Sequence, residues 1–173
     1  LICSAYKWFG PHIGVMYMKK ELLAELDFYN VMCEDIATGP RRMHMGTPQY
    51  ELLVGVTEAV NFIASVGENY VDVFADRIKG LSGRRKNIVA GMEAIDHYEQ
   101  GLAKQLRVGL RDIPGVKVYG PAEGQPRTPT VVFTVEGKLA SDVTKILGAK
   151  GINAWDGDYY AVEIIDVLGL REA

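Results

Sequence analysis

A stripe of apolar residues at helical spacing occupies the middle of the chain. Its members recur three or four positions apart: Ile88, Met92, Ile95, Tyr98, Leu102, Leu106 and Leu110. This spacing places them on one face of an α-helix, and the run stops at Ile113-Pro114-Gly115, where proline and glycine end a helix. The stripe therefore predicts one long amphipathic helix whose apolar face packs against a core.

Shorter elements precede this helix. Leu1 to Cys3 have the composition of the end of a buried strand, and residues 12–18 predict a second short strand after the loop-forming pair Gly10-Pro11. Residues 21–26 favour a short helix, residues 38–48 an irregular loop, and residues 49–65 an amphipathic helix that ends near Gly67.

The segments after the long helix alternate in type. Residues 116–119 and 130–135 predict strands, 139–147 a helix, Ile152 a short strand, and 161–168 a last helical stretch. This order is typical of a small α/β layer. Because residues 79–83 interrupt the apolar pattern, we expect two domains, over residues 1–80 and 81–173.

Composition narrows the classes of function. The 173 residues are 48% hydrophobic and 24% charged, which excludes a disordered or coiled-coil chain. A net charge of −3 gives no basic field for nucleic acid or an anionic membrane, and no apolar run approaches the roughly 20 residues of a membrane helix. Two cysteines without a secretory signal indicate the cytoplasm, with Cys3 and Cys33 as small buried hydrophobic residues.

Lys7 is the first candidate for chemistry. It follows the first strand and has aromatic neighbours and the Gly10-Pro11 corner close by in sequence. An amine that is partly desolvated there would have a lowered pKa and could attack a carbonyl group. The alternative is an ordinary solvated surface lysine.

Two separated motifs follow one another along the chain. Residues 3–17 contain Ser4 and Lys7, then Gly10-Pro11 and a glycine-containing strand, and residues 45–51 contain Gly46-Thr47-Pro48. In this order they resemble the lysine segment, Ser-x-His-Lys followed by Gly-Pro, and the Gly-Thr-Pro loop of the class V aminotransferases, the fold type I pyridoxal-phosphate (PLP) enzymes that include the cysteine desulfurases. Residues 113–116 and 151–152 match the C-terminal domain. The resemblance implies an α/β fold, the C-terminal part of a PLP-dependent transferase: the end of the large cofactor domain, a long connecting helix and a small α/β domain.

The resemblance also implies roles for particular residues. Lys7 would form the internal aldimine with PLP and shuttle the proton at the α-carbon of an amino-acid substrate. Ser4, Tyr6, Gly46 and Thr47 would bind the cofactor, chiefly at its phosphate. In the family the threonine reaches the neighbouring subunit's cofactor, so Thr47 implies a homodimer.

Two departures from the family pattern bear on the reaction. Tyr6 stands where a histidine usually precedes the lysine, and Tyr160, within residues 157–161, stands where a desulfurase carries its sulfur-accepting cysteine. A phenol cannot carry that sulfur, so we expect an aminotransferase or a cysteine desulfurase-like lyase. A desulfurase that uses another thiol would be inhibited by alkylation of Cys3 or Cys33.

Other hypotheses remain open. The chain could be a catalytically inactive α/β dimerisation or interaction module that keeps only the family's shape.

The family's aspartate partner of the pyridine nitrogen and its substrate-binding arginine would lie outside these residues, so we expect these 173 residues alone to be inactive. Arg41 and Arg42, just before the Gly-Thr-Pro motif, either help to bind an anion or the partner subunit or are a solvated pair on a loop. His12, His44 and His97 share no metal-ligand spacing, so we expect no metal site.

Overall fold

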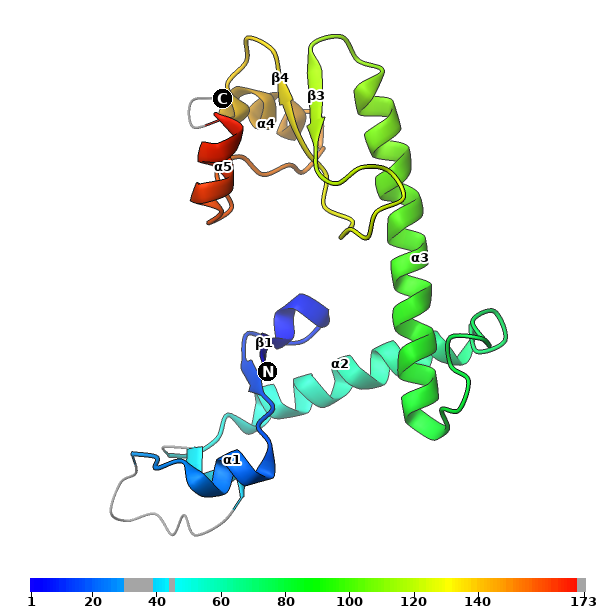
Figure 1. The fold of residues 1–173 in the computed structure, drawn as a ribbon, viewed down its shortest axis with the longest axis vertical. Coiled ribbons are helices and arrows are strands. Elements are labelled where there is room, and N and C mark those ends of the chain that lie inside the picture. The colour runs from blue at the N-terminus through cyan, green and yellow to red at the C-terminus, as the bar shows by residue number, and fades with distance from the viewer. Residues whose placement is uncertain (30–38, 44–45, 171–173) are drawn as a thin grey trace. The chain divides into compact units, whose positions relative to one another are not determined.

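The computed structural model describes residues 1–29, 39–43 and 46–170. The structure divides into two compact units, Leu1–Ala94 and Ile95–Ala173, and the division falls inside the long helix. Figure 1 shows the order of the elements along the chain. These compact units are not a test of the domain boundary expected near residue 80, which concerns the domains of the whole family fold and stays a prediction.

The first unit begins with a two-stranded antiparallel ribbon. Strand β1 (Ile2–Ser4) pairs with β2 (Gly14–Met16), and Cys3 lies opposite Val15. The residues between them form the short 3-10 helix η1 (Ala5–Trp8). The expected buried strand is wrong in this respect: Ile2 and Cys3 are exposed, because only β2 lies beside β1 among the strands of the described residues. Cys33 lies outside the described residues.

Two short helices follow the ribbon. Helix α1 (Lys20–Glu25) is the predicted short helix, and η2 (Pro40–Met43) lies in the segment expected to be irregular. The Arg42 guanidinium donates hydrogen bonds to the carbonyl oxygens of Leu23 at 2.7 Å, Ala24 at 3.2 Å and Leu26 at 3.0 Å. Arg42 thus caps the C-terminal end of α1, where a cation suits the helix dipole, whereas Arg41 is exposed.

The core of the first unit lies where two long helices cross. Helix α2 (Tyr50–Glu68) is the predicted amphipathic helix, and α3 (Gly83–Arg111) is the predicted long one. The two helices come close at Gly67 of α2 and Gly91 of α3. The small residues buried on these helices are Ala59, Ala64, Gly67, Ala90 and Gly91. Ile63 of α2 and Ile78 of the connecting turns complete this core.

The apolar stripe of α3 is less covered than its periodicity predicts. Tyr98, Leu102 and Leu106 are half to two-thirds exposed, and the buried positions of this part of the helix are Ala103 and Arg107. Periodicity identifies the apolar face of a helix, but the described residues cover only part of it.

The second unit contains the end of α3 and the smaller elements after it. Strands β3 (Val116–Tyr119) and β4 (Val132–Val135) pair antiparallel, with Val118 opposite Phe133. Helices α4 (Ala140–Gly148) and α5 (Val162–Leu168) follow. The strand expected at Ile152 is wrong: Gly151 has a positive φ of 75°, and the Ile152 amide donates to the carbonyl of Leu147, so this residue closes the end of α4.

No helix within the described residues is both long enough and apolar enough to cross a lipid bilayer.

Candidate active site

Lys7 lies on η1, the turn enclosed by the β1–β2 ribbon. The sequence predicted a loop, but one turn of 3-10 helix forms, and it ends at Phe9 with a left-handed φ of 70°. Ala5, the first residue of this turn, is fully buried; its amide donates to the Ile13 carbonyl at 2.9 Å, and its own carbonyl accepts from the Gly10 amide at 2.9 Å. These backbone bonds fix the path of the chain on both sides of Lys7.

Glycine is required at the corner of this turn. A Cβ atom on Gly10 would lie 2.8 Å from the Cβ of Ala5 and 2.9 Å from its carbonyl oxygen. Because Ala5 is fully buried, it has little room to move away. The Gly10-Pro11 pair, which the sequence marked only as a loop former, therefore lets the chain close over Ala5.

The turn rests on helix α2 through two contacts. The ring of Phe9 meets the ring of Phe62 edge to face, with centroids 5.2 Å apart. A Cβ on Gly55 would lie 3.1 Å from Cγ of Pro11, so the proline ring packs directly on the helix backbone there. Local sequence patterns could not reveal these contacts, because Phe62 is 53 positions from Phe9 and Gly55 is 44 positions from Pro11. The turn is thereby held by a long helix of the first unit.

The side chains around Lys7 are aromatic but leave it exposed. Its Nζ lies 5.8 Å from the centroid of the Tyr6 ring, and Tyr6 stacks on His12 with a centroid separation of 4.7 Å and an interplanar angle of 24°. Lys7 itself is exposed, so the aromatic neighbours do not provide the expected partial desolvation within this chain. The geometry presents a primary amine beside a stacked Tyr6–His12 pair.

The predicted phosphate-binding residues fall into two groups. Ser4, Tyr6 and Lys7 are brought together at the junction of β1 and η1. Gly46, with a φ of 108°, and Thr47 are exposed, and among the described residues no hydrogen bond joins either of them to the Lys7 turn. The hydroxyl groups of Ser4, Tyr6 and Thr47 have no hydrogen-bond partner in the described part of the chain, so they are available as donors.

Residues 157–161, which resemble the desulfurase cysteine loop in sequence, are strained and open to solvent. Tyr159 and Tyr160 both have left-handed backbone angles, φ 55° and 61°, an arrangement that costs on the order of 1–3 kcal/mol per residue outside glycine. The Asp158 carboxylate accepts from the Tyr160 amide at 2.9 Å, and the Tyr159 hydroxyl donates to the Trp155 carbonyl at 2.6 Å. The side chain of Tyr160 is fully exposed.

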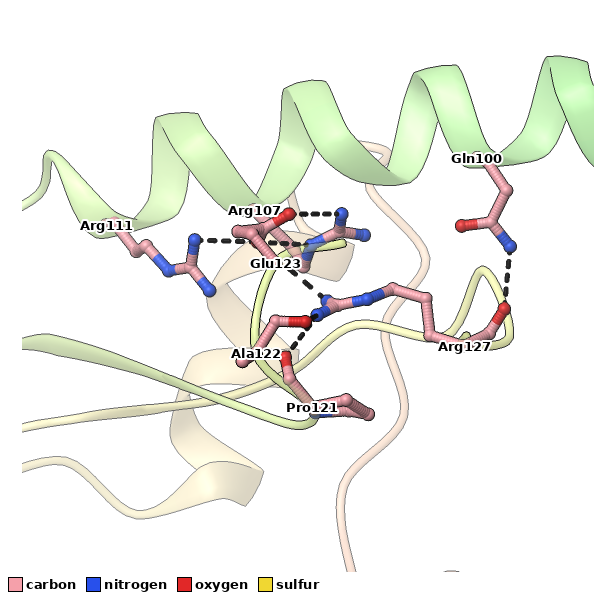
Figure 2. A network of polar contacts seen from close by, with 7 residues as sticks. All are labelled: Gln100, Arg107, Arg111, Pro121, Ala122, Glu123 and Arg127. Atoms are coloured by element: carbon pink, nitrogen blue, oxygen red, sulfur yellow. Dashed lines mark hydrogen bonds and ion pairs between the residues drawn. The ribbon is translucent and has the colours of Figure 1, made fainter. Parts of the chain in front are cut away.

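A cluster of charged residues in the second unit was not predicted. Figure 2 shows Arg107 and Arg111 of α3 beside Glu123 and Arg127 of the loop between β3 and β4. The Glu123 carboxylate accepts from Nε and Nη2 of Arg107, both at 3.3 Å, and from Nη1 of Arg111 at 2.8 Å. These hydrogen bonds lower the pKa of Glu123 from 4.5 to about 2, and those from Arg107 have the larger effect.

The described residues contain no group of three or more histidine, cysteine, aspartate or glutamate side chains arranged to hold a metal ion.

Comparison with known proteins identifies the family. The aminotransferase class-V family model matches residues 86–172. The chain is 30% identical over 169 residues to uncharacterized protein MT3887 of Mycobacterium tuberculosis, covering 98% of this chain and 39% of that protein. It is 26% identical over 172 residues to probable cysteine desulfurase 2 of Mycobacterium leprae, covering 93% and 35%. It is 24% identical over 181 residues to a cysteine desulfurase of Salmonella agona, covering 98% and 38%.

The chain belongs to the class-V aminotransferase family. Its mixed helices and small sheets agree with a part of that α/β fold, so the fold class inferred from the sequence is confirmed. The chain spans less than two-fifths of the length of these relatives. The matched residues 86–172 do not include Lys7 or Thr47, whose roles are taken up below as proposals.

Proposed function

We propose that the complete protein is a PLP-dependent enzyme that acts on an amino acid, as an aminotransferase or as a cysteine desulfurase-like lyase. Lys7 is the residue that bonds to the cofactor. The observation that supports this most is the η1 turn, which is fixed by Ala5 and Gly10, rests on α2, and presents the Lys7 amine.

The donor chemistry near Lys7 suits the cofactor. PLP, when bound, supplies an electron-withdrawing ring that stabilises negative charge at the α-carbon of the substrate. The amine of Lys7 then moves the proton at that carbon. Ser4 and Tyr6 donate hydroxyl hydrogen bonds to the phosphate, and bonds to such an anion are about twice as strong as those between neutral groups.

In this proposal Thr47 binds the cofactor held by the partner subunit, not the cofactor bound to Lys7 of its own chain. Gly46 and Thr47 are exposed and, within the described residues, are not hydrogen-bonded to the Lys7 turn. In a homodimer, the Thr47 hydroxyl would donate a hydrogen bond to the phosphate bound by the partner subunit. This would give a partner to a hydroxyl that has none among the described residues of the single chain. The dimer and the cytoplasmic location stay predictions.

Reduction with borohydride tests the role of Lys7. The complete protein, reduced and digested, should yield a phosphopyridoxyl adduct on the peptide that contains Lys7. The adduct should disappear in Lys7→Ala and persist in Lys19→Ala, which removes an exposed lysine outside the turn. An adduct elsewhere refutes the assignment. No adduct in the complete protein favours the inactive dimerisation or interaction module.

The two reaction types are separated by the products of cysteine. A desulfurase converts cysteine to alanine and leaves the sulfur on a protein thiol as a persulfide, from which an added thiol reductant releases sulfide. Alkylation of an exposed thiol such as Cys3 would stop a reaction that depends on it. Because Tyr160 offers no thiol, we expect the complete protein to transfer or eliminate an amino group without forming a protein persulfide. Sulfide release that is sensitive to alkylation would reverse this choice.

A further inference from the structure

Four cationic side chains surround one hollow in the second unit. The hollow lies between α3 and the loop from β3 to β4, and Lys104, Arg107, Arg111 and Arg127 line it. Lys104, Arg107 and Arg111 share one face of the helix, because they are three and four positions apart. Two carboxylates line the same hollow, Asp96 and Glu123. The lining therefore carries an excess of two positive charges.

Glu123 cannot satisfy the guanidinium groups that approach it. An ionised carboxylate has about four lone-pair sites, whereas each guanidinium has five N–H donors. Its bonds to Arg107 are long, at 3.3 Å, and Nη1 of Arg127 is 4.0 Å away. Asp96 accepts instead from the Gln100 amide at 3.2 Å. The cluster has more donors and more positive charge than its own acceptors balance.

Arg107 is the buried centre of this excess. Its side chain is 5% exposed, and its Nη1 atom is buried without a hydrogen-bond partner among the described residues. Buried donors nearly always have a partner in native proteins, and a charged one most of all. The Nη1 atom of Arg107 therefore needs a hydrogen-bond acceptor, and the surrounding positive charge favours an acceptor that is negatively charged.

The loop that carries Glu123 has its own anchor. The Arg127 guanidinium donates to the carbonyl oxygens of Pro121 and Ala122, and the Gln100 amide donates to the Arg127 carbonyl at 2.8 Å (Figure 2). The bonds from Arg127 fold the loop onto itself, and the bond from Gln100 ties it to α3 without Glu123. The carboxylate of Glu123, which is about half exposed, can therefore be exchanged for another anion while the hollow keeps its walls.

We propose that this hollow binds a small oxyanion of two negative charges, either a phosphate group or a dicarboxylate. Lys104, Arg107 and Arg111 hold it, and Glu123 competes with it for the two arginines. The proposal is independent of PLP and of the Lys7 turn, which belongs to the other unit.

Titration with inorganic phosphate tests the proposal on the full chain, at pH 7.5 and at an ionic strength held constant with chloride. We expect saturable binding by calorimetry. Glu123→Gln removes the competing charge and should tighten binding about fivefold. Arg111→Gln and Lys104→Gln should each weaken it about threefold to fivefold. The control is Arg85→Gln at the other end of the same helix, an exposed position outside the hollow, and it should change nothing.

The same titration is repeated with succinate, a dicarboxylate, in place of phosphate. Binding of both anions defines a general oxyanion site, and binding of phosphate alone or succinate alone defines a selective one. The absence of saturable binding for both anions, in the wild type and in Glu123→Gln, overturns the proposal. An equal loss in Arg85→Gln and Arg111→Gln also overturns it, because the effect would then be general screening. The Arg111 and Lys104 variants leave the loop anchor intact, so they test the site even if Glu123→Gln disturbs the loop.

Discussion

Gly67 of α2 and Gly91 of α3 meet where the two helices cross, and neither position has room for a side chain. A Cβ on Gly67 would lie 2.7 Å from the backbone nitrogen of Gly91 and would overlap the backbone oxygen of Asn87. A Cβ on Gly91 would overlap the backbone oxygen of Ile63. The helices are therefore in backbone contact, and this contact supports the α2 helix on which the Lys7 turn rests.

Gly67→Ala is expected to destabilise the chain. The added methyl group meets backbone atoms, which cannot rotate away, so the helices must separate at a cost of about 1–3 kcal/mol or more. Thermal unfolding followed by circular dichroism should show a lowered Tm. Gly101→Ala is the control, because its Cβ meets nothing within 4 Å and alanine is the better helix former by about 0.5–1 kcal/mol. Equal stability of the two variants would show that the helices do not cross this closely.

Gly10→Ala should disturb the Lys7 turn more than the whole fold. Its methyl group would press on buried Ala5, so the turn has to open, whereas Gly14→Ala on β2 meets nothing within 4 Å. Hydrogen exchange of the Ala5 and Gly10 amides, both bonded in the turn, should become faster in Gly10→Ala and stay unchanged in Gly14→Ala. Faster exchange in both variants would argue against a specific role for Gly10.

Arg42→Met should fray helix α1. The guanidinium satisfies carbonyl groups that have no partner within the helix, and its loss should destabilise that end by on the order of 1 kcal/mol. Amide exchange over α1 measures the effect. Arg41→Met is the matched control, since Arg41 is the exposed neighbour. If both variants exchange alike, the cap contributes nothing.

Local patterns predicted the helices well. The apolar spacing from Ile88 to Leu110 gave the long helix, whose periodicity needs no knowledge of its partners. The same pattern could not show that Leu102 and Leu106 would be half exposed, because exposure depends on what packs against the helix. Ile152 has a β-branched side chain typical of strands, yet the preceding Gly151 turns it back onto α4.

The candidate sites differ in how far sequence alone could define them. The Lys7 turn was found because its residues are nearly contiguous, from Ser4 to His12. Its contacts with Gly55 and Phe62 were not, because they join segments far apart in the chain. Arg107 and Glu123 are sixteen residues apart, and Glu123 lies in a loop that the Arg127 guanidinium bends through bonds to the carbonyl oxygens of Pro121 and Ala122. Such a bend leaves no periodic signal in the sequence.

The stability contributed by Glu123 should depend on pH in the acid range. Its pKa is lowered in the folded chain from 4.5 to about 2, chiefly by hydrogen bonds from Arg107 and Arg111. The folded state therefore favours the ionised carboxylate. Its contribution is complete above pH 4.5 and is lost as the pH falls through this interval toward 2. The wild type should accordingly be more stable than Glu123→Gln at pH 6, and the difference should shrink steadily below pH 4.5.

Urea unfolding of both proteins over this range, in a buffer of monovalent anions, measures that difference. Glu136→Gln, which changes an exposed carboxylate outside the cluster, should show no comparable trend. A difference between wild type and Glu123→Gln that stays constant down to pH 3 would mean that Glu123 does not bind the arginines as an anion.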